Sequence, residues 1–153
     1  MKTEMQVLEK LKETMASGIG AFYENESEPE PQAIDGRSIE IDFPDADGMP
    51  RDTMMFIQPD GESLEPLSMG SDLATMDATV CIMCRGASNA VLIRRVFAWC
   101  NAFCMLMKSS PTLGGLIDSS VLTGIEYYPA VTASRSMTAI EIALQLQWTK
   151  EFR

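Results

Sequence analysis

Two segments of the chain place their apolar residues on one face of a helix. The first runs from Thr3 to about Tyr23, and Thr3 with Gln6 has the spacing of a capping box. The second is preceded by Ser88, a good capping residue, and runs to about Lys108. The apolar positions are Leu8, Leu11, Met15, Ile19 and Phe22 in the first segment and Leu92, Val96, Trp99, Phe103 and Leu106 in the second. The sequence therefore predicts two amphipathic helices.

Other segments alternate between apolar and polar residues, as strands with one buried face do. The clearest alternation covers residues 136–149, where one face consists of Ile140, Ile142, Leu144, Leu146 and Trp148. Weaker strand patterns cover residues 38–43, 53–58, 77–85 and 116–128. We therefore predict a two-layer α+β fold. It has a mostly antiparallel or mixed sheet of about four to five strands, with both helices packed on one face.

Three polar stretches separate these elements. Residues 24–36 are rich in glutamate and are expected to be an exposed acidic linker. Residues 44–52 are expected to form the long tip of a hairpin between the strands 38–43 and 53–58. Residues 59–72 are acidic again and are expected to be a long loop. A loop as long as residues 59–72 is more often functional than a short connector is, so this loop and the hairpin tip are candidates for contact with a partner.

The whole chain has a net charge of −10 at pH 7, and its acidic residues are concentrated in one part of the sequence. Residues 24–77 contain 15 acidic and two basic side chains, whereas residues 78–153 contain seven basic and four acidic ones. An acidic surface repels phosphate backbones, so direct binding to nucleic acid is not expected. No apolar run approaches the roughly 18 residues that a membrane span needs, and charges interrupt the first 15 residues. We therefore expect a cytosolic protein without a membrane partner.

The four cysteines are arranged as two pairs, Cys81-x-x-Cys84 and Cys100-x-x-x-Cys104. Together they are similar to a zinc site with four thiolates, which needs paired ligands that converge. The first pair lies in a predicted strand, where a spacing of three sends the side chains to opposite faces. We therefore expect reduced, partly buried thiols and no metal site. A metal-binding protein built on these cysteines stays open as an alternative.

Other kinds of site have weaker support. The run Asp45-Ala-Asp47-Gly48 is similar to the start of a calcium loop, but Phe43 and Met54 occupy positions where that loop needs acidic ligands. The chain contains no histidine, so the commonest general base is absent. It also contains neither a Gly-x-Ser-x-Gly motif nor a glycine-rich phosphate loop. We therefore predict neither an enzyme nor a cofactor.

The second helix carries apolar residues where solvent is expected. With Leu92 at the centre of the buried face, Phe97, Cys104 and Met105 fall on or near the opposite side. One exposed apolar side chain is ordinary, but three along one helix flank indicate a contact surface. We predict a subunit interface that consists of Arg94, Phe97, Asn101, Cys104 and Met105.

The carboxy-terminal half resembles a known family. Over residues 73–150 the order is strand, helix, a Leu113-Gly114-Gly115 turn, a strand ending in Tyr127-Tyr128-Pro129, and a final alternating strand from Ala139 to Trp148. This order is similar to that of the tail terminator, or tail-completion, proteins of long-tailed bacteriophages. The resemblance implies one tail-terminator-like domain over residues 1–153.

The same resemblance implies a structural role in the virion. Such proteins form hexameric rings that cap the tail tube, end its polymerisation and join the tail to the head connector. They have no catalytic residues and no cofactor. The expected partners are copies of the chain, the tail tube protein and the head–tail connector, while DNA passes through the ring without specific binding. Assembly would take place in the host cytoplasm, and the final location would be the tail or neck of the virion.

The predicted hairpin tip and the predicted loop 59–72 are long enough to reach the tube or connector. The predicted contacts in these two segments are Asp45, Asp47, Arg51, Asp60, Glu62 and Glu65. Three alternatives stay open. A head–tail connector or neck protein has much the same appearance. A cytosolic metal-binding protein would use the four cysteines. An acidic adaptor would bind a basic protein.

Overall fold

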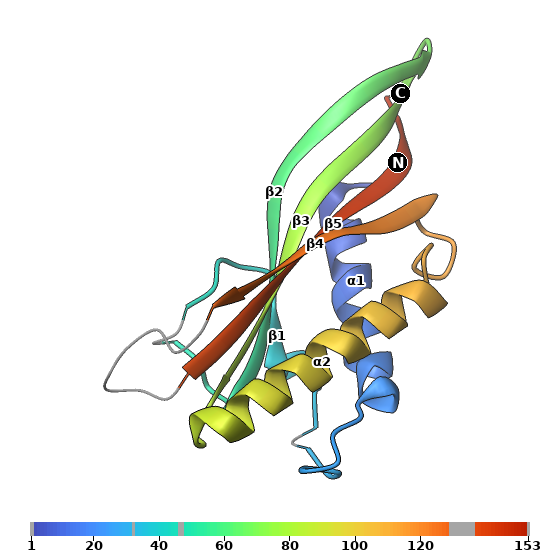
Figure 1. Cartoon of the computed structure of the whole chain (residues 1–153). Coiled ribbons are helices and arrows are strands. Elements are labelled where there is room, and N and C mark those ends of the chain that lie inside the picture. Colours follow the sequence, from blue (N-terminus) through green and yellow to red (C-terminus); the bar gives the residue numbers. More distant parts are fainter. Residues whose placement is uncertain (1, 32, 46–47, 129–136, 153) are drawn as a thin grey trace.

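The computed structural model describes residues 2–31, 33–45, 48–128 and 137–152, and within them a five-stranded sheet carries two helices on one face (Figure 1). The helices are α1 (Glu4–Gly18) and α2 (Asn89–Ser109). The strands are β1 (Ile39–Glu40), β2 (Thr53–Ser68), β3 (Ser71–Arg85), β4 (Ser119–Tyr128) and β5 (Met137–Glu151), in the spatial order β1-β2-β3-β5-β4. β1 and β2 are parallel and the other pairs are antiparallel. The predicted two-layer α+β fold with a mixed sheet is confirmed.

The predicted helices are both present. The Thr3 side chain accepts a hydrogen bond from the backbone N–H of Gln6, and the Gln6 side chain accepts one from the backbone N–H of Thr3, so the capping box is formed. α1 continues into a short 3₁₀ helix over Ile19–Phe22. Ser88 precedes α2 at its capping position but makes no side-chain capping bond. The predicted buried faces are confirmed for all five positions of α2 and for Leu8, Leu11, Met15 and Ile19 of the first helix.

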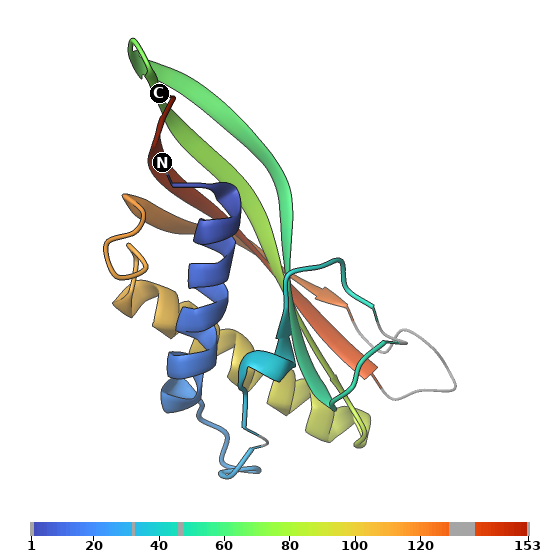
Figure 2. The ribbon, with the colours of Figure 1, turned by 180° about the vertical axis from the view of Figure 1, so that it is seen from behind.

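α2 is a core helix of this fold. By length and composition its 21 residues could cross a membrane, and half of that apolar window is buried inside the protein. Its buried residues pack under β3 and β5, and both helices cover the same face of the sheet from either view (Figure 2). The apolar character of α2 therefore follows from its place in the core.

The two faces of the sheet carry different apolar clusters. The helix-side face contains the predicted β5 set of Ile140, Ile142, Leu144, Leu146 and Trp148, all of them buried. The opposite face holds a smaller cluster, made by Met49, Met54, Phe56, Cys81, Met83, Met137 and Ala139. β5 is paired with β3 from Ser71 opposite Glu151 to Arg85 opposite Met137. β3 and β5 therefore form the centre of the sheet.

The predicted hairpin with its tip at residues 44–52 is wrong. The first strand is only Ile39–Glu40, and it runs parallel to β2, with Ile39 opposite Met55. Phe43, the last residue of the predicted strand 38–43, is 70% exposed. The Asp42 carboxylate accepts a hydrogen bond from the Phe43 N–H, a local bond that competes with strand pairing. Of the predicted tip, Asp47 lies outside the described residues.

The predicted acidic loop over residues 59–72 is also wrong. These residues are the outer half of β2, a turn at Met69 and Gly70, and the start of β3. The register shifts between Pro59 and Gly61 and again between Pro66 and Ser68, so the prolines sit at bulges. Within the described chain, only β3 pairs with this part of β2, and proline is tolerated on such an edge.

The acidic stretch 24–36 contains neither an α-helix nor a strand in its described residues, as predicted. It is not exposed throughout, however. Ile34 is 8% exposed and joins the main core, and Glu28 is held by Arg95 of α2. The prediction of an exposed linker is therefore wrong at these two residues.

Candidate interaction surface

An exposed apolar surface lies where α2 passes the end of β4. We call it the flank patch and define it as Ile93, Phe97, Tyr127 and Tyr128, which are 44%, 39%, 61% and 40% exposed. The rings of Phe97 and Tyr127 meet edge to face, with centroids 5.1 Å apart and planes at 60°. This contact joins helix and strand, so the patch is one continuous surface.

A groove of about 240 Å³ opens between the residues of the flank patch. Residues 138–140 of β5 and Val96 form the rest of its wall, and nearly all of the exposed wall is apolar. The groove therefore offers shape and apolar area but few groups that could orient a polar ligand. Such a surface suits an apolar side chain of a partner protein better than a charged small molecule.

β4 makes the outer edge of the sheet beside this groove. In the described part of the chain β4 pairs only with β5, which leaves one row of its backbone N–H and C=O groups open. Proteins usually protect such edges with charges, prolines or a covering segment. β4 has ten residues, SSVLTGIEYY, and Glu126 is its only charged one. An edge of this composition is expected to be covered when the protein works.

The structure places four of the five predicted interface residues on the outer side of α2, but Cys104 packs against the main core, so the predicted exposure is wrong there. Phe97 belongs to the flank patch, Met105 is 48% exposed and Cys104 is partly buried. Asn101 is exposed, and Arg94 donates a hydrogen bond to the Ser27 hydroxyl at 2.9 Å. Their role in an interface stays a prediction.

Sequence reasoning missed three members of the flank patch, Ile93, Tyr127 and Tyr128. Ile93 lies four residues before Phe97, on the same helical stripe, and this spacing could have identified it. The two tyrosines lie in an alternating strand, where nothing local indicates that the strand is at an edge. The juxtaposition of β4 with α2 depends on the order of strands in the sheet.

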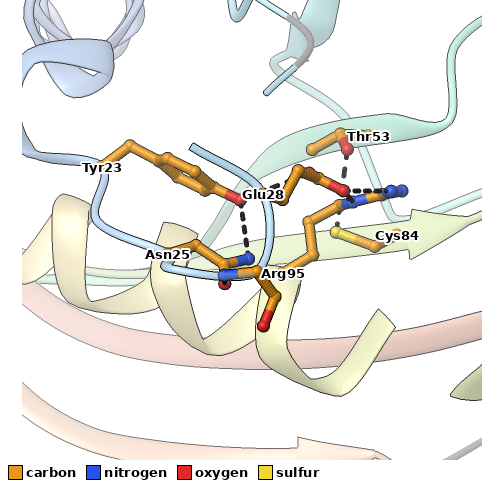
Figure 3. Close-up of polar contacts among 7 residues, drawn as sticks. Tyr23, Asn25, Glu28, Thr53, Cys84 and Arg95 are labelled. Atoms are coloured by element: carbon orange, nitrogen blue, oxygen red, sulfur yellow. Dashed lines mark hydrogen bonds and ion pairs between the residues drawn. The ribbon is translucent and has the colours of Figure 1, made fainter. Parts of the chain in front are cut away.

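A polar cluster holds the segment after α1 across the other flank of α2 (Figure 3). The Arg95 guanidinium donates three hydrogen bonds to the Glu28 carboxylate, two from Nε at 2.9 and 3.2 Å and one from Nη2 at 2.7 Å. The Tyr23 hydroxyl donates to Glu28 at 3.3 Å and accepts from Asn25 at 3.0 Å. The Glu28 carboxylate raises the pKa of Arg95, and burial raises the pKa of Tyr23. The cluster fixes one flank of α2 inside the subunit and leaves the flank patch open.

The first two cysteines lie on opposite faces of the sheet. Cys81 lies in the smaller cluster and Cys84 in the main core, so the predicted opposite orientation is confirmed. Burial raises the pKa of both thiols to about 12. Cys84 also contacts the Thr53 hydroxyl at 3.8 Å (Figure 3). No group of three or more histidine, cysteine or carboxylate side chains gathers at a common point within the described ranges.

Cys100 and Cys104 lie one turn apart on α2 and differ in reactivity. The hydrogen bond from Cys100 and the nearby charge of Lys108 lower the pKa of Cys104 to about 7, against the effect of burial. The same hydrogen bond, together with burial, raises the pKa of Cys100. Cys100 is 2% exposed, whereas Cys104 is partly accessible. Cys104 is therefore the thiol of this pair that ionises first.

The residues predicted to contact the tube do not form one surface. Asp45 and Arg51 precede β2, whereas Asp60, Glu62 and Glu65 lie in its outer half. Several already have partners in the subunit. Asp45 accepts from the Gly48 N–H at 3.1 Å, and Arg51 binds Asp35 at 3.2 Å.

The three carboxylates of β2 also differ from one another. Asp60 accepts from the hydroxyl of Thr79 at 2.6 Å. Glu62 binds Lys150, which also binds Glu4. Glu65 is exposed and lies opposite Leu73.

No protein-family model and no curated protein sequence matches this chain.

Proposed function

We propose that this chain is the subunit of a homo-oligomeric ring that caps a bacteriophage tail tube, ends its polymerisation and joins the tail to the head connector. One observation carries the proposal. The β4 edge and the flank patch form an apolar surface that lacks the protection usual in a protein that works as a monomer. The order β3, α2, β4, β5 is the one on which the resemblance to tail terminators rests.

The chemistry of this surface favours a protein partner. The flank patch is rich in aromatic residues, which are enriched at protein interfaces. An open strand edge adds a row of backbone groups that a neighbour can pair with. The described residues contain no group of three or more cysteine or carboxylate side chains that could hold a metal ion, so this geometry does not favour a metal-binding protein. A contact between subunits would bury the aromatic side chains of the flank patch and would cover the open strand edge.

The charge of the chain is compatible with a channel for DNA. The net charge is −10, so a wall made of this protein would repel the phosphate backbone instead of retaining it. DNA would then pass through the ring without specific binding. Asp45, which precedes β2, and Glu65, which lies in its outer half, stay proposed contacts with the tube or connector.

Light scattering coupled to size-exclusion chromatography tests the ring. We expect one discrete oligomer, alone or with the tail tube protein of the same phage. Phe97→Glu should shift it towards monomer, because the new carboxylate would be desolvated in the contact. Phe43→Glu is the matched control, since Phe43 is exposed and lies away from the flank patch. A wild-type monomer under both conditions would refute the ring.

Electron microscopy of tube-assembly reactions tests the capping role. Adding the protein should shorten the tubes and place a ring at one end. A ring found only at the far side of a separate connector layer would instead support a neck protein. Unchanged tube lengths, with the ring free in solution, would contradict the proposed terminator function.

A further inference from the structure

A second exposed apolar surface lies at the β2–β3 turn. We call it the tip patch and define it as Leu64, Leu67, Met69 and Phe152, which are 47%, 55%, 103% and 48% exposed. The Phe152 N–H donates to the Gly70 carbonyl at 2.7 Å, which holds the end of β5 against the turn. The turn extends beyond the ends of both helices (Figures 1 and 2). The tip patch therefore stands free of the core of its own subunit.

The tip patch and the flank patch lie at opposite ends of the subunit. Tyr127 of the flank patch is opposite Ile140 on β5, and at the other end of β5 Glu151 is opposite Ser71, next to the turn. At about 3.3 Å per residue, the eleven residues from Ile140 to Glu151 place the two ends roughly 35 Å apart. A neighbour that contacts one patch leaves the other patch free.

The two ends of the subunit also differ in charge. Residues 59–68, the outer part of β2, contain three carboxylates and no basic residue. Beside the flank patch the charges are mixed. Arg94, next to Ile93, is exposed, Arg95 is already paired with Glu28, and the Glu126 carboxylate accepts a hydrogen bond from Tyr128. A contact between two tips would bring carboxylates together, and a contact between tip and flank avoids this repulsion.

We propose that the tip patch of one subunit docks into the flank groove of a second copy of this chain, so that the subunits assemble head to tail. An apolar groove lined by Phe97 and Tyr127 suits the flexible side chain of Met69 and the branched side chain of Leu67. Because two different patches meet, the interface is heterologous, and repetition generates a closed ring when the rotation per subunit closes. This inference rests on the proposed ring and specifies its lateral contact.

Cysteine cross-linking tests the contact directly. In a Cys104→Ser background the three remaining native thiols are 0 to 3% exposed, so they should not react with a short bismaleimide. We would prepare Leu67→Cys, Phe97→Cys and the double variant. Both positions are exposed, so each variant should fold, and circular dichroism would verify this.

The expected products follow from the head-to-tail geometry. Each single variant alone should give no covalent dimer. A mixture of the two should give dimers only, and the double variant should give a ladder that ends at one discrete size. Phe43→Cys with Phe97→Cys is the matched control and should give at least tenfold less product, because Phe43 is exposed and follows β1, which pairs with the end of β2 that is remote from the tip.

The outcomes separate this inference from the proposed function. If light scattering shows a ring but Leu67→Cys and Phe97→Cys do not cross-link, the tip-to-flank contact is wrong and the ring stands. A dimer from Leu67→Cys alone would show a contact between tips and would overturn the head-to-tail arrangement. If the wild type stays monomeric alone and with the tube protein, and no ladder forms, both proposals fail.

Discussion

Replacing Glu28 with glutamine tests whether the ion pair with Arg95 fixes the segment after α1. The carboxylate and guanidinium side chains are only 23% and 17% exposed and are joined by hydrogen bonds of 2.7 to 3.2 Å. Charge-assisted hydrogen bonds of this geometry contribute more than neutral ones, and a half-buried cation left without its partner is costly. We expect Glu28→Gln to lower the free energy of unfolding by about 1.5 kcal/mol.

A double-mutant cycle isolates the pair. Arg95→Met keeps most of the aliphatic stem and should also cost about 1.5 kcal/mol, while the double variant should cost about 2 kcal/mol. The coupling free energy is then about 1 kcal/mol. The exposed pair Lys10–Glu13, joined at 3.4 Å with side chains 36% and 71% exposed, is the matched control. Glu13→Gln should change the free energy of unfolding by less than about 0.5 kcal/mol.

Urea unfolding followed by tryptophan fluorescence measures these differences. Trp99 reports on the segment after α1 because the centroids of its ring and the Tyr23 ring are 4.4 Å apart, and Tyr23 donates a hydrogen bond to Glu28. With a slope of about 2 kcal/mol per molar urea, a loss of about 1.5 kcal/mol lowers the midpoint by roughly 0.7 M. A coupling free energy below about 0.3 kcal/mol, or equal effects of Glu28→Gln and Glu13→Gln, would refute a stabilising role for the pair.

Two further predictions concern a turn and a thiol. Gly86→Ala should lower the free energy of unfolding by about 2 kcal/mol, because Gly86 has φ +86° and an added Cβ would lie 2.8 Å from an oxygen of Asp52. Gly20→Ala, which meets nothing within 4 Å, should be neutral or slightly stabilising; equal thermal shifts for the two variants would contradict this account. Alkylation of Cys104 should show a midpoint near pH 7, because its pKa is lowered to about 7, and Cys100→Ala should move the midpoint upwards. An unchanged midpoint in Cys100→Ala would show that the hydrogen bond from Cys100 does not set the acidity.

The parts of the fold that could be predicted are those set by local periodicity. The spacing of apolar residues such as Trp99 and Leu144 predicts both helices and the buried face of β5. This spacing shows which side of an element is buried, whichever element covers that side. The outer half of β2 was missed for the opposite reason. Taken from the sequence alone, turns are indicated by Pro59, Gly61 and Pro66. A strand can contain these residues here because the outer half of β2 lies at the edge of the sheet.

The candidate surface could be predicted only in part for the same reason. Phe97 was found because an apolar residue on the outer side of a helix is visible in the sequence. Tyr127 is an ordinary strand residue until the strand order places β4 at an edge and brings its ring against Phe97. The direction of β1 relative to β2 was likewise fixed by a long-range pairing, between Ile39 and Met55.

The central ladder of the sheet bears on whether head-to-tail contacts close into a ring. β3 and β5 are paired without a register shift from Ser71 opposite Glu151 to Arg85 opposite Met137. This ladder connects the end that carries the tip patch to the end that carries the flank patch, so the two patches keep a fixed relative orientation. A rigid connection between the two patches makes the rotation between neighbours the same at every step. The assembly closes when that rotation divides a full turn without a rise, and otherwise it forms an open filament. The bulges of the subunit lie in β2 and β4, where they can shape the two contact surfaces without bending the ladder between them.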